Sequence, residues 1–289
     1  MKKYLTLNED LKKYFKEKIC KISLDTGFTC PTRDGTKGLN GCYYCGETGS
    51  HYLNPKLTIQ EQLEKRKIQL KKCYKDPLFL AYFQSFTPTY GSIEEIKALF
   101  NPVLLDKEIV GINVATRPDT LDDEKIDFLV NILKSYYHWV EVGLETSHNK
   151  TLDSIGRGHT YEDFCRTYNK LKEKGLRVCV HLILGLPNET DEMILATIDR
   201  MIQLKVDGLK LHNLHIVKNS VFEILYDQKK ISLYTYSEYL NLLVKIIKKL
   251  PPEIVLHRLV GEAPEPYLIA PAWVRKKMQF LKDLDLQLT

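Results

Sequence analysis

The chain has 289 residues, 44% of them hydrophobic, and its 42 Lys and Arg against 37 Asp and Glu give a net charge of +5. This length suits one large domain, or one domain with a small appendage, whose core needs no disulfide. No apolar run reaches 18 residues and the N-terminal segment turns polar early, so we expect neither a membrane span nor a secretion signal. The seven cysteines then indicate a reducing cytoplasm. The mild basicity is compatible with a nucleic-acid substrate without establishing one.

Hydrophobic patterning predicts strands and helices in regular alternation along the chain. After a short helix at 7–16, the predicted strands are 18–24, 78–84, 109–115, 139–144, 177–184, 208–216 and a short one at 254–258. The predicted helices are 57–74, one from 92, one around 126–133, 160–175, one around 194–202, 219–228, 235–249 and one from 271. Three helices are expected to begin at capping boxes, which pair Thr58 with Glu61, Ser92 with Glu95 and Thr160 with Asp163.

Six consecutive βα units imply a parallel sheet with helical crossovers, and six strands are too few to close an eight-stranded barrel. We therefore expect an α/β fold, a partial (β/α)6 TIM-like barrel with a C-terminal helical extension. The expected divisions are a lead-in at 1–17, the core at 18–230 and the extension at 231–289. In parallel α/β folds the functional residues lie at the C-terminal ends of the strands.

A glycine-rich loop after the first of these strands contains three cysteines, Cys30, Cys42 and Cys45, the last two in a C-x-x-C pair. Four thiolates usually hold an iron–sulfur cluster, so a cluster on three of them leaves one iron open for a substrate or cofactor, which is the interpretation we favour. A zinc site is the alternative and needs a fourth ligand. Candidates for that ligand are Cys20, His51 and Cys73. A redox pair is a third interpretation.

The same loop resembles that of the radical S-adenosylmethionine (radical SAM) superfamily, with Tyr44 as the aromatic residue before the third cysteine. Most members space the cysteines C-x3-C-x2-C, whereas this chain has C-x11-C-x2-C. The lengthened loop, Cys-Pro-Thr-Arg-Asp-Gly-Thr-Lys-Gly followed by Gly-Cys-Tyr-Tyr-Cys, is similar to the bacterial YtqA/YhcC family, a relative of the Elongator catalytic subunit. The resemblance implies the open barrel of that superfamily. It also implies a 4Fe–4S cluster on Cys30, Cys42 and Cys45, whose open iron chelates the amino and carboxylate groups of S-adenosylmethionine (SAM).

Polar residues replace the apolar pattern after the second strand, at Gln84, Ser85 and Thr87. In radical SAM enzymes this position holds a glycine-rich segment that binds the methionine amino group, so the resemblance places these three residues at the cofactor. The alternative is a turn built by Pro88 and Gly91.

Arg117 follows the third strand. An arginine there can hold a carboxylate or phosphate of the substrate. The alternative is that Arg117 pairs with Asp119 or Asp122 and caps the following helix.

Glu145 ends the fourth strand, and Arg157 follows it in the next segment. An acid at a strand end can accept hydrogen bonds from two ribose hydroxyls, and an arginine can hold a carboxylate. The block resembles the YtqA/YhcC and Elongator pattern, which implies SAM contacts for both residues. The alternative is a structural ion pair between them. Glu141 alternates with apolar residues, so we interpret it as pointing to the other face, buried and paired.

His181 lies within the fifth strand. It either faces the barrel interior as a cofactor contact, which we favour, or is a core histidine. Leu184 ends that strand before a Gly-Leu-Pro turn, which by itself indicates a helix N-terminus. The resemblance implies that main chain at this point lies along the adenine of SAM.

Alternation along the sixth strand places Lys210, His212 and Leu214 on one face. If that face lines the barrel, Lys210 and His212 reach the substrate. His257 and Arg258 are candidates for the same rim.

The remaining cysteines, Cys73, Cys165 and Cys179, are interpreted as small buried or half-buried residues without chemistry. A basic set near the C-terminus is interpreted as solvated helix faces, with a tRNA-binding strip as the alternative. The set is Lys245, Lys248, Lys249, Arg275, Lys276 and Lys277.

The resemblance also implies a reaction: an electron from the reduced cluster cleaves SAM, and the resulting deoxyadenosyl radical takes a hydrogen atom from the substrate. The YtqA side of the family, also called MnmL, is associated with turning the carboxymethylaminomethyl group of the tRNA wobble uridine into aminomethyl. We therefore expect a cytoplasmic tRNA-modifying enzyme with an electron donor such as flavodoxin or ferredoxin. No acetyltransferase segment follows, so we expect no acetyl transfer. The alternatives are a small-molecule or protein substrate, or a non-catalytic zinc or iron–sulfur RNA-binding module.

Overall fold

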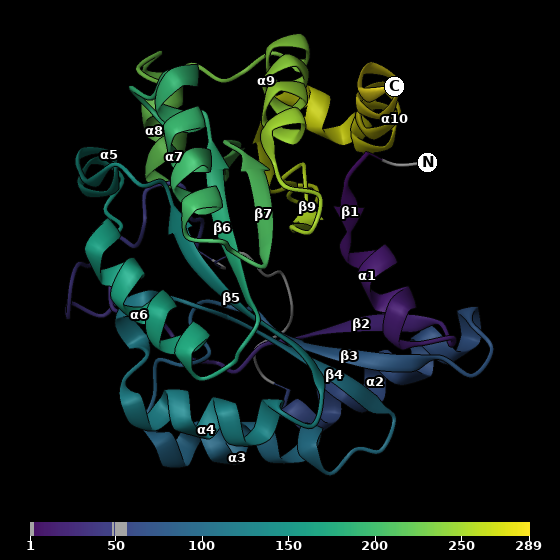
Figure 1. Cartoon of the computed structure of the whole chain (residues 1–289). Coiled ribbons are helices and arrows are strands. Elements are labelled where there is room, and N and C mark those ends of the chain that lie inside the picture. The colour runs from purple at the N-terminus through teal and green to yellow at the C-terminus, as the bar shows by residue number, and fades with distance from the viewer. Residues whose placement is uncertain (1–2, 48, 50–56) are drawn as a thin grey trace.

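A curled parallel sheet forms the centre of the computed structural model, which describes residues 3–47, 49 and 57–289 (Figure 1). Its order is β1-β9-β7-β6-β5-β4-β3-β2, with every neighbouring pair parallel. The strands are β1 (Leu5–Thr6), β2 (Ile19–Leu24), β3 (Leu78–Phe83), β4 (Ile109–Thr116), β5 (Tyr137–Glu145), β6 (Val178–Leu184), β7 (Gly208–Asn213) and β9 (Val255–Arg258). The expected partial barrel is confirmed, and the short strands β9 and β1 extend it beyond the six strands that were predicted for it.

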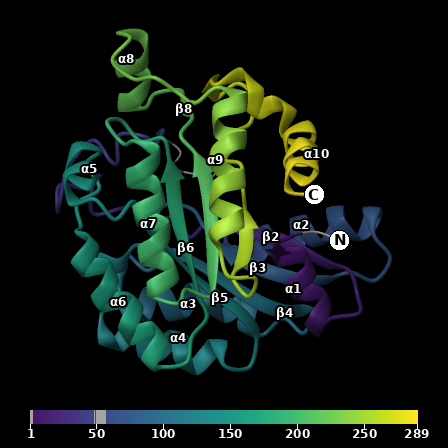
Figure 2. The same ribbon diagram turned by 45° about the horizontal axis from the view of Figure 1, so that its top comes forward.

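Most of the helices follow strands and cover the outer face of the sheet, which Figure 2 shows from a second direction. The helices of the described chain are α1 (Leu7–Tyr14), α2 (Ile59–Cys73), α3 (Ile93–Leu104), α4 (Asp123–Leu133), α5 (Asn149–Ser154), α6 (Tyr161–Glu173), α7 (Asp191–Gln203), α8 (Val221–Asp227), α9 (Tyr236–Lys249) and α10 (Lys277–Leu288). The three expected capping boxes begin α2, α3 and α6. Helix α5 and the antiparallel pair β8 (Ile216–Val217) and β10 (Leu268–Ala270) were not predicted.

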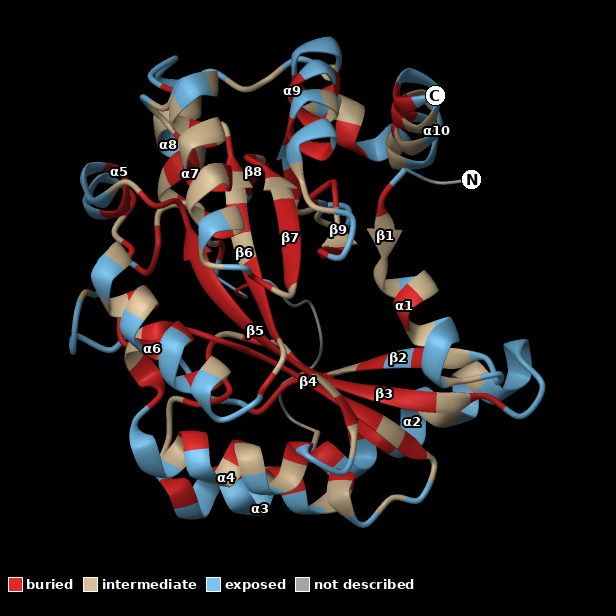
Figure 3. Cartoon of the chain, in the orientation of Figure 1, coloured by how far each residue is buried: buried red, intermediate tan, exposed pale blue. Residues whose placement is uncertain are grey.

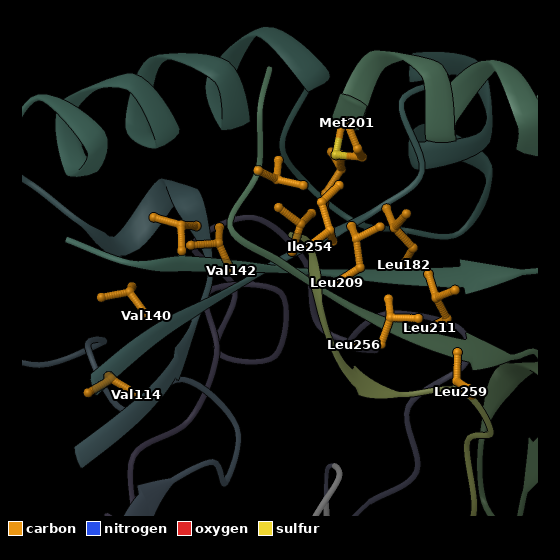
Figure 4. Close-up of a cluster of buried hydrophobic side chains, with 14 of the residues drawn as sticks. Val114, Val140, Val142, Leu182, Met201, Leu209, Leu211, Ile254, Leu256 and Leu259 are labelled. Carbon is orange, nitrogen blue, oxygen red and sulfur yellow. The ribbon is translucent and has the colours of Figure 1, made fainter. Parts of the chain in front are cut away.

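The main core lies between the sheet and these outer helices, and the buried residues in Figure 3 follow that layer. Alternate residues of each strand point outward, among them Val140 and Val142 of β5 and Leu209 of β7, and Met201 of α7 packs in the same cluster (Figure 4). This period of two assigns one face of each strand to the helices. The residues between them therefore face the inside of the barrel.

Inside the barrel, the first halves of the strands are filled by a second apolar cluster. It contains Tyr137, Trp139 and Cys179, with Leu7 and Leu11 packed against it. This cluster closes the barrel at the N-terminal ends of the strands. The polar strand residues that line the pocket consequently lie in the middle and at the C-terminal ends of the strands. At the closed end, the buried Asp10 carboxylate accepts a hydrogen bond from the Tyr137 hydroxyl at 2.7 Å.

Strand β1 and helix α10 lie side by side at one edge of the sheet (Figure 1). Leu5 pairs with Val255, and the Tyr4 hydroxyl donates to Asp285 Oδ1 at 2.9 Å. The predicted lead-in thus contributes a strand to the sheet, while the boundaries expected at residues 17 and 230 stay predictions. Within the described part of the chain, no helix combines the length and apolar character that a membrane span requires.

Candidate active site

A cavity of about 370 Å³ lies at the C-terminal ends of the strands, between the cysteine loop and the sheet. All three predicted cluster ligands, Cys30, Cys42 and Cys45, line it. The other predicted site residues that line it are Tyr44, Gln84, Thr87, Arg117, Glu145, Arg157, His181, Lys210 and His212. The fold therefore gathers these residues, which are spread over 183 positions of sequence from Cys30 to His212, into one pocket.

The cysteine loop is folded by its own main-chain hydrogen bonds. The Cys45 N–H donates to the Cys42 carbonyl at 2.9 Å, and the Gly41 N–H donates to the Thr32 carbonyl at 2.8 Å. Gly41 has φ +69°, and a Cβ there would lie 2.9 Å from the Arg33 side chain. Both facts favour glycine immediately before Cys42.

Two guanidinium groups surround the Cys42 thiol. Arg157 Nη1 lies 3.6 Å and Arg117 Nη1 lies 3.7 Å from its Sγ. Although burial opposes it, these two positive charges lower the pKa of the Cys42 thiol and favour the thiolate. Cys30 differs, because burial raises the pKa of its thiol while Thr87 Oγ1 lies 2.9 Å from its Sγ.

The thiols that line the pocket fit an iron–sulfur cluster by the chemistry of their donors. Within the described ranges, no three Cys, His, Asp or Glu side chains are grouped closely enough to hold a metal ion. Of the fourth ligands considered for zinc, Cys20 lies in β2 and Cys73 at the end of α2, both outside the pocket lining. His51 lies outside the described residues.

Glu145 and Arg157 form a buried pair at the end of β5, with Glu145 Oε1 3.4 Å from Arg157 Nη2. Arg157 Nη2 also donates to the Gly143 carbonyl at 2.6 Å. The pairing of β5 with β6 is irregular between Gly143 and Glu145, and Glu145 has φ +76°. Glu145 thus lines the pocket from a strained position at the end of the strand. Arg157 Nε is buried with no partner among the described residues, so the guanidinium retains an unsatisfied donor.

The residues after β3 divide into two groups. Gln84 and Thr87 line the pocket, whereas Ser85 is fully buried and its hydroxyl has no partner in the described part of the chain. Leu184 is also buried, and its carbonyl accepts from the Leu214 N–H at 2.8 Å. A cofactor role for Ser85 and Leu184 stays a prediction.

Arg117 is held by Asp119 through two hydrogen bonds of 2.9 Å. It also donates to the Arg157 carbonyl at 2.6 Å. Arg117 therefore makes the ion pair that was one of its two interpretations, while still lining the pocket. Its contact with substrate stays a prediction.

Glu141 lies inside the barrel, so its interpretation as pointing to the other face was wrong. It shares a face with Gly143, because the strand alternation is regular up to that point. Its Oε2 accepts from Tyr82 at 2.6 Å and from Lys210 at 2.8 Å, and it lies 2.8 Å from His181 Nε2. It is buried and paired, as expected.

Sequence reasoning missed Tyr82, which lines the pocket beside Lys210. The sequence did indicate a pocket position for Tyr82, because it stands two residues before Gln84 and therefore lies on the same face of the strand. It was overlooked because it lies within a run of apolar residues. Arg33 was also missed, and its Nη2 donates to the Gly46 carbonyl at 2.6 Å on the loop side of the pocket.

The cysteines outside the pocket are placed by secondary structure. Cys179 is buried in β6 and Cys165 is half-buried on α6. Cys73 is exposed rather than buried, because it ends α2 at the surface.

The basic set near the C-terminus is largely ion-paired. Lys245 pairs with Asp191, Lys249 with Asp199, Arg275 with Glu265 and Lys277 with Glu262. These pairs favour solvated faces over a continuous tRNA-binding strip.

The fold and the pocket together define an α/β half-barrel protein with a three-thiol loop at the C-terminal ends of its strands. The sequence profile of the radical SAM superfamily matches residues 36–201, and that of the radical SAM C-terminal domain matches residues 206–289. YtqA of Bacillus subtilis (strain 168) is 36% identical over 289 residues, 99% of this chain and 90% of YtqA. YhcC of Escherichia coli K12 is 34% identical over 278 residues, 96% of this chain and 89% of YhcC. The chain belongs to the radical SAM superfamily and, within it, to the family of YtqA and YhcC.

More distant similarity is also present. The tRNA uridine(34) acetyltransferase of Dehalococcoides mccartyi is 26% identical over 184 residues, which make up 62% of this chain and 39% of that protein. The structure of Elp3 from the archaeon Methanocaldococcus infernus, with an N-terminal deletion, has a TM-score of 0.69 and 17% identity. That match covers 93% of this chain and 64% of the Elp3 chain and shows the same fold. Radical SAM enzymes use a 4Fe–4S cluster and SAM, and Cys30, Cys42 and Cys45 are the residues of this chain that fit the cluster.

Proposed function

We propose that this radical SAM enzyme modifies the wobble uridine of tRNA, converting its carboxymethylaminomethyl group into aminomethyl. The observation that carries the proposal is one pocket lined by two chemically different elements. The cysteine loop contributes three thiols to the lining, and strand β7 contributes the polar residues Lys210 and His212. Such a pocket can hold a cofactor and a polar substrate group together.

Each part of this lining has its own task. Cys30, Cys42 and Cys45 hold the cluster, which when bound supplies the electron that cleaves SAM and so starts hydrogen abstraction from the substrate. Glu145 accepts hydrogen bonds from the ribose hydroxyls, and the spare donor of Arg157 binds the methionine carboxylate. The remaining contacts proposed for SAM are Tyr44, Gln84, Ser85, Thr87, His181 and Leu184.

Three lines of support favour tRNA as the substrate. A distant relative is a tRNA uridine(34) acetyltransferase, so a related chain acts on the same nucleoside. The net charge of +5 favours a polyanion. Lys210 and His212, with Arg117 as a further contact, are suited to a polar or anionic group of the base. We further propose cytoplasmic action with a donor such as flavodoxin or ferredoxin.

The test begins with anaerobically reconstituted protein reduced with dithionite, with Cys42→Ala as the variant and Cys165→Ala as the matched control. We expect deoxyadenosine from the wild type and from Cys165→Ala, and none from Cys42→Ala. The substrate is then tested with tRNA that carries carboxymethylaminomethyluridine, whose nucleosides are analysed after the reaction. Aminomethyluridine supports the proposal. Fully cluster-loaded protein that cleaves SAM but leaves this nucleoside intact refutes the tRNA reaction and leaves the superfamily chemistry in place.

A further inference from the structure

The inner wall of the pocket is formed by β7 and β9, and its positive charges are unequally balanced. Lys210 is buried and donates to Glu141 Oε2 at 2.8 Å, so a carboxylate of the protein compensates it. Arg117 pairs with Asp119 and Arg157 with Glu145. Each of these three cations of the pocket therefore has its own acid.

Arg258 is different. It lines the pocket and is partly buried. No ion pair or hydrogen bond joins its guanidinium to another described residue. Glu262 also lines the pocket, but it is paired with Lys277, whose Nζ lies 2.7 Å from Glu262 Oε1. The guanidinium of Arg258 is only partly buried, and none of its nitrogens is among the buried atoms without a partner. It is therefore free to bond an anionic group that enters the pocket.

The backbone places Arg258 in the pocket through an irregularity in the sheet. β9 pairs regularly with β7 through Leu256, and the register then shifts so that Arg258 lies beside Lys210. His257, the residue before it, points to Glu141, with its Nδ1 3.2 Å from Oε1. Two successive residues of β9 are thereby directed to the barrel interior. Bulges of this kind redirect side chains near functional sites.

His212 supplies a second, independent observation. Its ring lines the pocket, and its Nε2 is buried with no hydrogen-bond partner among the described residues. Burial and the positive charge of Arg258 hold the pKa of His212 well below its usual value, so the imidazole is neutral. A buried ring nitrogen that lacks a partner in the protein is positioned to bond a ligand.

From these observations we propose that Arg258 and His212, beside Lys210, form a subsite for one carboxylate group of the substrate. On the wall that β7 and β9 form, Arg258 is the cation without an acid, whereas Arg33 on the loop side donates to the Cys45 and Gly46 carbonyls. The charge of this wall therefore fits a monoanion. The planar fork of a guanidinium matches a carboxylate in two parallel hydrogen bonds. The inference rests on the proposed function for the source of that carboxylate, the carboxymethylamino group of the modified uridine. A backbone phosphate of the RNA is the other source of the same charge.

The first experiment distinguishes these two sources with the cluster-loaded, full-length protein. Binding is measured for two anticodon stem-loops that differ only at the wobble base, carboxymethylaminomethyluridine or uridine. We expect Arg258→Gln to weaken binding of the modified stem-loop by about 30-fold or more and to leave the uridine stem-loop nearly unchanged. Arg258→Lys, which keeps the charge and loses the fork, is expected to recover part of the loss. Lys97→Gln, at an exposed position of α3, is the matched control for a lost positive charge.

Equal weakening of both stem-loops assigns Arg258 to phosphate and overturns the inference. A second binding experiment tests the carboxylate subsite without RNA, so that its failure can be told apart from a failure of the proposed function. It compares the affinity for N-benzylglycine, which contains a carboxymethylamine, with that for benzylamine, which lacks the carboxylate. If the wild type does not prefer the modified stem-loop but binds N-benzylglycine through Arg258, the tRNA assignment fails and the carboxylate subsite stands. If Arg258→Gln binds N-benzylglycine as the wild type does, the subsite is refuted. Thermal unfolding of each variant shows that the comparison is made on folded protein.

Discussion

Lys210 Nζ lies 2.8 Å from Glu141 Oε2, and the two residues are 5% and 3% exposed. They come from strands β7 and β5, and β6 lies between those strands. Although burial alone would raise it, the Lys210 ammonium and the hydrogen bonds with His181 and His257 hold the pKa of the Glu141 carboxyl well below its usual range. The pair therefore crosses the barrel interior as a charged contact rather than as two neutral groups.

Removing one member of this pair is expected to be costly. Glu141→Gln leaves the Lys210 ammonium buried without a counterion, so we expect the free energy of unfolding to fall by about 3 kcal/mol or more. Urea denaturation measures the change. The double variant Glu141→Gln with Lys210→Met removes both charges and should lose less than the sum of the single changes. Additive losses in this cycle contradict the predicted coupling.

A methyl group at Gly143 should disrupt the Glu145–Arg157 pair. Its Cβ would lie 2.5 Å from Arg157 Nη2 and 2.8 Å from Glu145 Oε1. We expect Gly143→Ala to weaken SAM binding to the cluster-loaded protein at least about tenfold, since overpacking costs about 1–3 kcal/mol. Equilibrium dialysis with labelled SAM measures the effect. Gly175→Ala is the control: its Cβ meets nothing within 4 Å and only its φ of +77° is strained. SAM affinity that is equal in both variants contradicts the prediction.

In cluster-free protein, the pKa of the Cys42 thiol should depend on Arg157. Arg157 lowers the pKa of this thiol against the opposing effect of burial, so Arg157→Gln is expected to raise it. At a fixed neutral pH the thiolate fraction then falls, and alkylation of Cys42 by iodoacetamide slows. Mass spectrometry of the Cys42 peptide across a pH series follows the shift. Arg157→Lys should keep the pKa of the Cys42 thiol closer to that of the wild type. The surface variant Arg166→Gln should leave this pKa unchanged. An unchanged Cys42 profile in Arg157→Gln means that Arg157 does not control this thiol.

Acid should destabilise the protein through His159. Burial, with the nearby charges of Arg157 and Arg117, lowers the pKa of His159 to about 3 in the folded state. An unfolded histidine titrates near its ordinary value of about 6.5. Below that pH the unfolded chain binds a proton that the folded chain rejects, so stability falls as the pH drops toward 3.

The expected contribution of His159 to this loss is about 2 kcal/mol at pH 5 relative to pH 8. His159→Gln should therefore show a smaller fall in the free energy of unfolding over the same range. The variant His148→Gln, at the partly buried N-cap of α5, is the comparison. If His159→Gln follows the wild-type pH dependence, His159 is not the group responsible.

Much of the fold could be read from local chemistry. The alternating βα order could be predicted from three local features, each of which depends on residues within a few positions of one another. These features are the apolar strand segments, the helix spacing and the capping residues Thr58, Ser92 and Thr160. The cysteine loop was equally evident, since Cys30, Cys42 and Cys45 lie in one short segment of sequence.

The direction of individual polar side chains depended on the tertiary structure. Glu141 was assigned to the wrong face even though it stands four residues before Glu145 and therefore shares its face by alternation. Its contacts with Tyr82 and Lys210 show that this shared face is the barrel interior. Arg117 had two suitable partners in sequence, and folding paired it with Asp119. Arg258 reaches the pocket through a shift in register between two strands, a feature that no local pattern encodes.

By itself, the sequence determined a parallel half-barrel and a three-thiol loop, since periodicity and cysteine spacing are properties of adjacent residues. Only the tertiary structure decided that Lys210 is neutralised by Glu141 while Arg258 has no described counterion. The physical reason is that charge compensation depends on distance in space, and these residues come from strands that are separated in the chain and brought together by the closing sheet.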